Sequence, residues 1–304
     1  MHKILFMKKI VTLIIVCFNF QTFLYTQSNN IDKPAYLIYN AQGEIVSYST
    51  MIQTVTQTDV CLFGELHNDP ISHWLELEIM KSLYQNKNEK LIVGAEMWES
   101  DNQLLLDEAF TNKFYDEAMY IESSKLWPNL KYDYLPLLQY AVKNNIKFIA
   151  TNIPRRYARM VSKMGLESLN ELSPLAKTYI APLPIPVDLT EYAYKSMMQE
   201  MPGGGNMKMV NPENFAKAQA IKDATMAHFI LKNWVPGSIF YHFHGEFHSA
   251  FHSGITYYLK VYNPKIKTKT ISIVKQIDIQ KLDTENLNRA DFIIVVPEEM
   301  SVSY

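Results

Sequence analysis

Two matching stretches, each at the end of an apolar run, constrain the fold of this chain most strongly. The first, Gly64-Glu65-Leu66-His67, ends the run at 60–63, and the second, His244-Gly245-Glu246-Phe247-His248, ends the run at 238–243. Each predicts a β-strand that leads into Gly-Glu-x-His, where glycine lets the backbone turn sharply without a Cβ clash. A third apolar run ends in Glu96.

Helix-like segments separate these apolar runs through most of the chain. Strands that alternate with helices are typical of an α/β fold with a parallel sheet and crossover helices. We therefore expect a largely parallel central sheet flanked by helices. The chain has 304 residues, enough for one large domain or two modest ones.

Residues 165–212 differ in composition from the rest of the chain. They contain several prolines, a Gly203–Gly205 loop and clustered methionine and tyrosine: Tyr192, Tyr194, Met197, Met198, Met201, Met207 and Met209. Methionine adapts its shape to apolar ligands. We expect a helical insertion near the carboxyl edge of the sheet that covers a flat apolar ligand. A subunit-contact element is the alternative.

The strand-end residues form a candidate site, because ligands of open α/β sheets bind at the carboxyl ends of the strands. His67, Glu96 and His248 would lie together, with Glu65 as a further carboxylate. Histidine and carboxylate suit a divalent metal such as Zn, Mn or Co, which would activate a bound water. Glu65 or Glu246 would then be the general base. In a metal-free variant, His67 or His248 is the base. Taken singly, each motif histidine is also explained as a hydrogen-bonded residue at a helix start.

Other polar residues flank these strand ends. His242 and His244 share one face of their strand. A predicted helix over 249–258 would place His248 and His252 one turn apart, although His252 is equally explained as a surface residue. Pro154 predicts a helix start whose Arg155 and Arg156 form an anion cradle. A solvated basic first turn is the alternative.

The N-terminus predicts export. Basic residues precede a short apolar run at 10–18, and a polar stretch follows, as in a cleaved secretory signal over residues 1–26. The mature domain would span 27–304, in the periplasm or cell envelope. Cys17 is placed where a lipid-bearing cysteine would anchor the protein to a membrane. Cys61 lies in an apolar strand and is expected to be buried. The net charge of -2 indicates no nucleic-acid surface.

Several motifs, in this order, resemble the ChaN-like haem-binding uptake family of the wider Tiki and erythromycin-esterase superfamily. They are Gly64-Glu65-Leu66-His67-Asn68-Asp69-Pro70, Gly94-x-Glu96-Met97, Asn152-Ile153-Pro154-Arg155, Ala218-Gln219 with Lys222-Asp223, and His244-Gly245-x-x-His248. The resemblance runs from about Val60 to Leu259.

The resemblance implies exported proteins of iron acquisition that can dimerise and hold haem between subunits. Iron is bound there through a tyrosine, which suits ferric iron, with a histidine nearby. No motif assigns this tyrosine here; the cofactor-binding candidates are Tyr132, Tyr134, Tyr192, Tyr194 and His244, with Arg155 or Arg156 for a propionate.

Enzymatic branches of the superfamily use both Gly-x-x-His motifs and a glutamate for hydrolysis. Carried over, these positions are His67, Glu96 and His248, with Glu65 beside them. A third hypothesis is a scaffold in which Glu–His hydrogen bonds only hold strand ends together, although burying polar groups is a costly way to do so. We favour haem binding, with a metal-dependent hydrolase as the alternative.

Overall fold

The structure is a computed structural model that describes residues 33–87, 90–111, 116–124, 127–200 and 211–303. The predicted signal segment and Cys17 lie outside these residues. Contacts divide the chain into residues 1–34 and a unit of residues 35–304, which contains all the elements described below. Within the described residues, no helix is both long and apolar enough to cross a bilayer.

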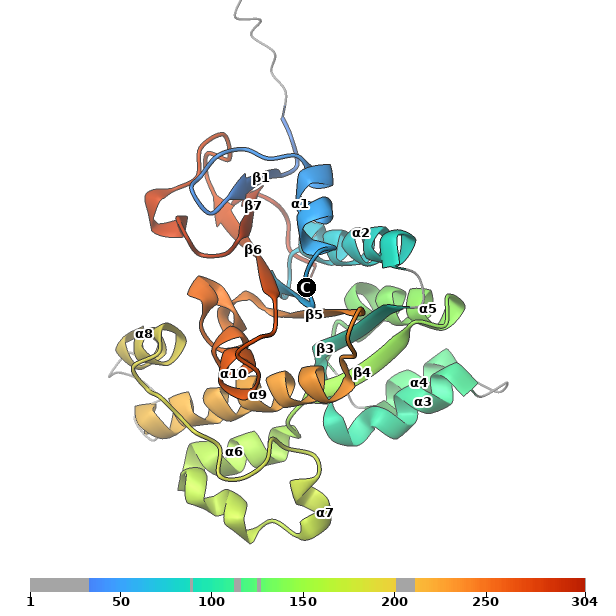
Figure 1. Ribbon diagram of the computed structural model, residues 1–304, viewed down its shortest axis with the longest axis vertical. Coiled ribbons are helices and arrows are strands. Elements are labelled where there is room, and N and C mark those ends of the chain that lie inside the picture. The colour runs from blue at the N-terminus through green and yellow to red at the C-terminus, as the bar shows by residue number, and fades with distance from the viewer. Residues whose placement is uncertain (1–32, 88–89, 112–115, 125–126, 201–210, 304) are drawn as a thin grey trace, which may run out of the picture. The chain divides into compact units, whose positions relative to one another are not determined.

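A single seven-stranded sheet organises this unit (Figure 1). In sheet order, its strands are β1 (Leu37–Asn40), β7 (Phe292–Pro297), β6 (Thr268–Gln276), β2 (Val60–Glu65), β5 (Ile239–Gly245), β3 (Leu91–Glu99) and β4 (Lys147–Asn152). Among these seven strands in the described residues, the edge pair β1–β7 is antiparallel and the other pairs are parallel. The predicted α/β fold with a largely parallel sheet is therefore confirmed.

Helices cover both faces of the sheet, because side chains of each strand alternate between two apolar cores. Cys61 and Phe63 belong to one core, and Val60 and Leu62 to the other. The first core includes α1 (Tyr48–Val55), α2 (Pro70–Lys87), α3 (Gln103–Thr111), α4 (Glu117–Ser124), the π-helix η3 (Leu130–Tyr134) and α5 (Leu135–Lys143). The second includes α6 (Arg155–Met164), η4 (Leu166–Glu171), α8 (Tyr192–Glu200), α9 (Pro212–Asn233) and α10 (Ile255–Tyr262).

Within the range 165–212, the described part contains η4, α7 (Pro174–Lys177) and α8. Ala193 and Tyr194 of α8 join the core that α9 also lines. Met201, Met207, Met209 and the glycine loop lie outside the described residues. The proposed role of this range as an insertion over a ligand stays a prediction.

Two helix starts follow their sequence signals. The Asp69 side chain accepts a hydrogen bond from the Ser72 backbone N–H at 2.9 Å, with Pro70 as the first residue of α2. Asp69 therefore satisfies one of the free N–H groups of the first turn. Pro154 directly precedes α6.

The predicted helix over 249–258 is wrong in its first half. Phe251 and His252 have φ values of 53° and 57° within η7 (Ala250–His252), and α10 begins only at Ile255. Left-handed residues interrupt a right-handed helix. Nδ1 of His252 therefore lies 3.5 Å from Oγ1 of Thr270, and His252 does not share a helix face with His248.

Candidate functional site

The two Gly-Glu-x-His motifs lie side by side, since β2 and β5 are adjacent parallel strands. Their register pairs Gly64 with His244 and Glu65 with Gly245. On the other side of β5, β3 supplies Glu96. Parallel strands end at one edge of a sheet, so residues far apart in sequence meet there.

The motif glycines are needed because each motif packs against the other. A Cβ on Gly64 would lie 2.7 Å from Cα of Glu246, and a Cβ on Gly245 would lie 2.7 Å from Nε2 of His67. Gly245 has a φ of -53°, which any residue can adopt. Close approach, and not a left-handed turn, is therefore the reason for glycine at this position.

His67 is oriented by Glu65. Its Nδ1 lies 2.6 Å from Oε1 of Glu65, which also accepts the Tyr134 hydroxyl hydrogen at 2.5 Å. Burial lowers the pKa of His67, but its hydrogen bond to Glu65 and the nearby Glu96 outweigh that and leave the pKa raised. Its side chain is 36% exposed, beside the Trp127 ring at 4.7 Å. With Nδ1 bound to a carboxylate, Nε2 is the nitrogen free to meet a ligand.

His248 is held between two carboxylates. Its Nε2 lies 3.2 Å from Oε1 of Glu96, and its Nδ1 lies 2.5 Å from Oδ1 of Asp223. Burial opposes the charged imidazolium, but these two carboxylates raise the pKa of His248 to about 10. Burial likewise raises the pKa of Glu96, yet His248 and Lys222 hold it well below its usual range. His248 is thus a buried cation that donates from both nitrogens.

His242 and His244 do lie on one face of β5, and both are fully buried. Thr151 donates its hydroxyl hydrogen to the carbonyl of Ala95, so it accepts from Nε2 of His242 at 2.7 Å. Nδ1 of His242 then accepts from Nδ1 of His244 at 3.0 Å. Burial and the charge on His248 lower the pKa of His244 to about 3. His244 is therefore a neutral imidazole behind the site.

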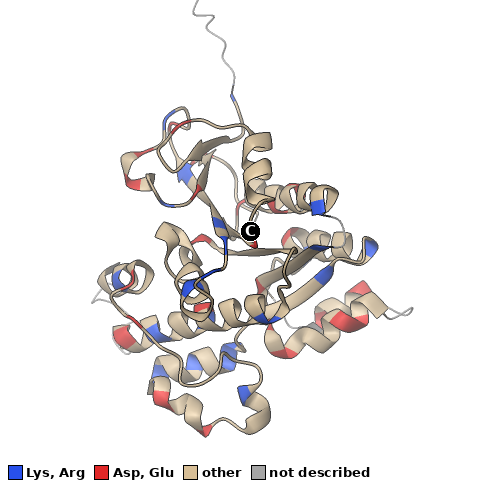
Figure 2. Cartoon of the chain, in the orientation of Figure 1, with Lys and Arg blue, Asp and Glu red and all other residues tan. Residues whose placement is uncertain are grey.

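A cavity of about 530 Å³ opens beside these residues. Its lining combines the polar site with apolar and basic side chains from α6, α8 and α9: His67, Glu96, Trp127, Arg155, Ala158, Arg159, Ser162, Met197, Phe215, Ala218, Gln219, Lys222, Phe247 and His248. Basic residues recur along α6 and α9 (Figure 2). The cavity thus has apolar walls and cationic groups, which suits a flat apolar ligand with anionic substituents.

Some predicted ligand residues lie away from this cavity. Arg156 pairs with Asp101 at 2.6 Å and is not part of the lining, whereas Arg155 is. The hydroxyls of Tyr134 and Tyr194 are buried and donate to Glu65 and to Asp223. Neither of these two hydroxyls is presented to the cavity.

The other two candidate tyrosines are exposed. Tyr132 is 77% exposed, and Tyr192 is 47% exposed and packs against Phe251 with ring centroids 4.3 Å apart. Neither lines the cavity. Their proposed role stays a prediction.

Metal binding by His67, Glu96 and His248 stays a prediction. Both nitrogens of His248 already donate to carboxylates. A metal ion bound there would have to displace one of these ion pairs.

Comparison with known proteins decides the family. Residues 51–259 match the family described as haem-binding uptake, Tiki superfamily, ChaN. The chain belongs to this family. Among curated proteins, none matches the sequence.

A solved structure at a TM-score of 0.65 has the same fold as this ChaN-family chain. A structure described as cofacial heme binding to ChaN of Campylobacter jejuni is 17% identical, with a TM-score of 0.65, and the match covers 86% of this chain and 96% of that one. A Bacillus cereus protein is 10% identical, and the match covers 82% of this chain and 90% of that one, with a TM-score of 0.47. An erythromycin esterase mutant in its open conformation is 8% identical, and the match covers 87% of this chain and 83% of that one, with a TM-score of 0.43.

The donor set of this ChaN-family chain fits haem. The cavity offers Nε2 of His67 as a nitrogen donor, aromatic walls in Trp127 and Phe247, and cations in Arg159 and Lys222. A neutral imidazole nitrogen binds haem iron, and guanidinium groups pair with carboxylates.

Several residues of the site were not assigned a role from the sequence. Asp223, Arg159 and Trp127 contact the site from α9, α6 and the segment before η3. Asp223 is an acidic residue among the buried positions of α9, and this is a signal that could have marked it. Arg159 lies one turn after Arg155, on the same side of α6.

Proposed function

We propose that this chain is an exported haem-binding protein that holds haem in the cavity beside His67. The observation that carries the proposal is Nε2 of His67, which is left free at an apolar cavity whose other polar groups are mainly cationic. Membership of a haem-binding uptake family supports it.

Each part of the cavity has a role in this proposal. Glu65 fixes the His67 ring through Nδ1, so that iron would bind at Nε2, in place of the proton that the raised pKa of His67 favours there. Arg155, Arg159 and Lys222 would pair with the propionates. Bound haem would supply iron as cargo for uptake.

A tyrosine would complete the ligation. Tyr132 and Tyr192 are the candidates with accessible hydroxyls, whereas Tyr134 and Tyr194 would first have to leave buried carboxylate partners. Burial and a neighbouring carboxylate also raise the pKa of both buried tyrosines, which opposes tyrosinate formation.

An absorbance titration of the purified protein with hemin tests the proposal. We expect a saturable, red-shifted haem band, and the Tyr132→Phe and Tyr192→Phe variants should each be compared with the wild type to find a tyrosinate charge-transfer feature. A titration without saturable change would contradict haem binding. A band that neither tyrosine variant alters would contradict the tyrosine part alone.

Hydrolysis without a metal is the second candidate function. It is favoured by the His67–Glu65 pair, which has the geometry of a general base oriented by a carboxylate. His248 is excluded as the base because it is held as a cation. Ester or amide hydrolysis that falls about 100-fold or more in His67→Ala would support this function. Hydrolysis unchanged in this variant would contradict it.

A further inference from the structure

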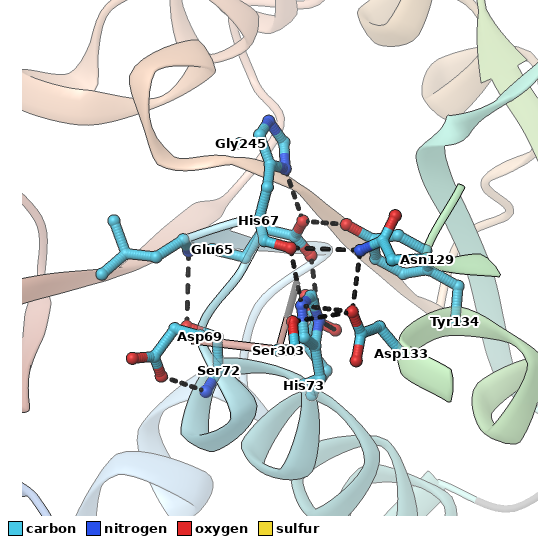
Figure 3. Close-up of polar contacts among 12 residues, drawn as sticks. Glu65, His67, Asp69, Ser72, His73, Asn129, Asp133, Tyr134, Gly245 and Ser303 are labelled. Atoms are coloured by element: carbon cyan, nitrogen blue, oxygen red, sulfur yellow. Dashed lines mark hydrogen bonds and ion pairs between the residues drawn. The ribbon is translucent and has the colours of Figure 1, made fainter. Parts of the chain in front are cut away.

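A second polar cluster lies behind His67, away from the cavity. It consists of Glu65 from the end of β2 and of His73 and Glu76 from α2, all buried, with exposures of 1%, 6% and 0%. Figure 3 shows the Glu65 carboxylate between the rings of His67 and His73. Of these three side chains, Glu65 has a role in the proposed haem site, and His73 and Glu76 do not.

Glu65 and Glu76 each have one carboxylate oxygen in this cluster without a hydrogen-bond partner. Oε1 of Glu65 takes both hydrogen bonds, from His67 and Tyr134, whereas its Oε2 has no hydrogen-bond partner and lies 3.7 Å from Nδ1 of His73. Oε2 of Glu76 lies 3.1 Å from the same nitrogen, and its Oε1 has no partner either. Buried oxygens without a donor are costly, so this arrangement indicates a missing positive partner.

A neutral His73 ring would present a nitrogen lone pair to the same space, where its Nδ1 lies 3.1 Å from Oε2 of Glu76. Its Nε2 lies 3.0 Å from the backbone carbonyl oxygen of His67 and must donate to it, so Nδ1 is left as the acceptor of the neutral ring. Metal-binding histidines typically donate their second nitrogen to a carbonyl or carboxylate in this way.

The surrounding charge is negative. Oδ2 of Asp133 lies 3.6 Å from Nε2 of His73. Among the described residues, only histidines form ion pairs with Glu65, Glu76 and Asp133. Buried charges are tolerated when they are paired or bind a metal.

We propose that Glu65, His73 and Glu76 form a second site, which binds one first-row divalent cation such as zinc. One ligand atom from each residue lies within 4.8 Å of the others. Zinc bonds of 2.0–2.2 Å in a tetrahedron require ligand atoms about 3.3–3.6 Å apart, close to the 3.1 and 3.7 Å observed around Nδ1 of His73. The alternative occupant is a proton shared by the two carboxyl groups.

The site would act on the cavity through Glu65, which belongs to both. An ion on Oε2 keeps Glu65 ionised while Oε1 holds Nδ1 of His67. The cation is therefore a structural support for the orientation of His67, and it does not itself reach the cavity.

Zinc titration of the chelator-treated, haem-free protein tests this site, with bound metal counted by elemental analysis. We expect one zinc per chain and a loss of affinity of about 100-fold or more in Glu76→Gln, which removes a ligand charge at constant shape. The matched control is Glu78→Gln on the same helix, whose side chain pairs with the partly exposed Lys81, and it should bind zinc like the wild type. Cobalt should give visible ligand-field bands in the wild type and not in Glu76→Gln.

A second variant separates this site from the cavity. His67→Ala should keep zinc binding within a few-fold, because His67 is not one of the three ligands. Zinc that is lost in His67→Ala and retained in Glu76→Gln would overturn the proposal, as would a wild-type protein that binds no zinc. Zinc should also raise the melting temperature of the wild type and of Glu78→Gln, but not that of a folded Glu76→Gln.

Discussion

Two glycines allow the strand-end motifs to lie against each other. Gly64 lies close against the backbone of Glu246, and Gly245 lies close against the ring of His67. The sequence pattern pointed to both glycines, but it indicated a sharp turn as the reason for them. A turn can be inferred from one segment, whereas a close approach involves two segments that are distant in the sequence. Gly64 approaches a backbone and Gly245 a side chain, so substitution by alanine should have different consequences at the two positions.

Gly245→Ala should affect the ligand more than the fold. Its Cβ would meet the end of the His67 side chain, which can rotate away. We expect a loss of hemin affinity of about 10-fold and a loss of unfolding free energy of about 1 kcal/mol. Gly64→Ala meets the Glu246 backbone, which cannot rotate away, and should cost about 2–4 kcal/mol. Urea unfolding and hemin titration of both variants check this; equal losses of stability would contradict it.

His248 should make stability depend on pH. Its pKa is raised from 6.5 to about 10 in the folded protein, so the stabilisation is fully present below pH 6.5 and is lost as pH rises toward 10. The loss is up to about 5 kcal/mol. Urea unfolding at several pH values measures it, and Asp223→Asn, which removes one carboxylate partner, should lower the pKa of His248 and so reduce the total loss. A wild-type stability that is constant over this range would contradict the charged state of His248.

At the scale of elements, α6 and α9 supply what the strands lack. The strands contribute His67, Glu96 and His248 near their carboxyl ends, whereas the helices add the cations and Asp223. The strand ends could be predicted because apolar runs stop at them. The helix residues could not, because helix periodicity identifies a buried face but does not say which strand end the helix packs against.

Arg159 and Arg156 lie on the same helix and offer a matched comparison. Arg159 lines the cavity, whereas Arg156 pairs with Asp101 outside it. We expect Arg159→Ala to weaken hemin binding about 10-fold, since a charge-assisted hydrogen bond contributes about 1.5–3 kcal/mol. Arg156→Ala should change hemin affinity less than 2-fold. If both variants bound hemin like the wild type, Arg159 would have no part in hemin binding.

The tyrosine candidates illustrate a further limit of sequence patterns. Tyr132 and Tyr134 are two positions apart, yet Tyr134 is fully buried and Tyr132 is 77% exposed. They lie in a π-helix, whose period differs from that of an α-helix, so α-helical spacing does not indicate which of the two is buried. Likewise, the left-handed φ of Phe251 and His252 could not be read from their residue types.

For the whole molecule, we predict export. Protein recovered from cells should lack about the first 26 residues, as measured by intact mass and N-terminal sequencing, because a basic and then apolar N-terminus is typical of a cleaved signal. A lipid-bearing chain would instead begin at Cys17 with a correspondingly larger mass. A mass that retains Met1 to Gln27 would contradict export. The size of the haem-loaded protein by light scattering tests the predicted homodimer separately.

In the proposed complex, His67 presents its Nε2 nitrogen to haem in the cavity. A hemin titration of the wild type and of His67→Ala, followed by absorbance, tests it most directly. We predict a saturable band in the wild type, and a shifted band with affinity reduced about 10-fold or more in His67→Ala, since a metal ligand is removed. The same spectrum and affinity in both proteins would contradict the claim.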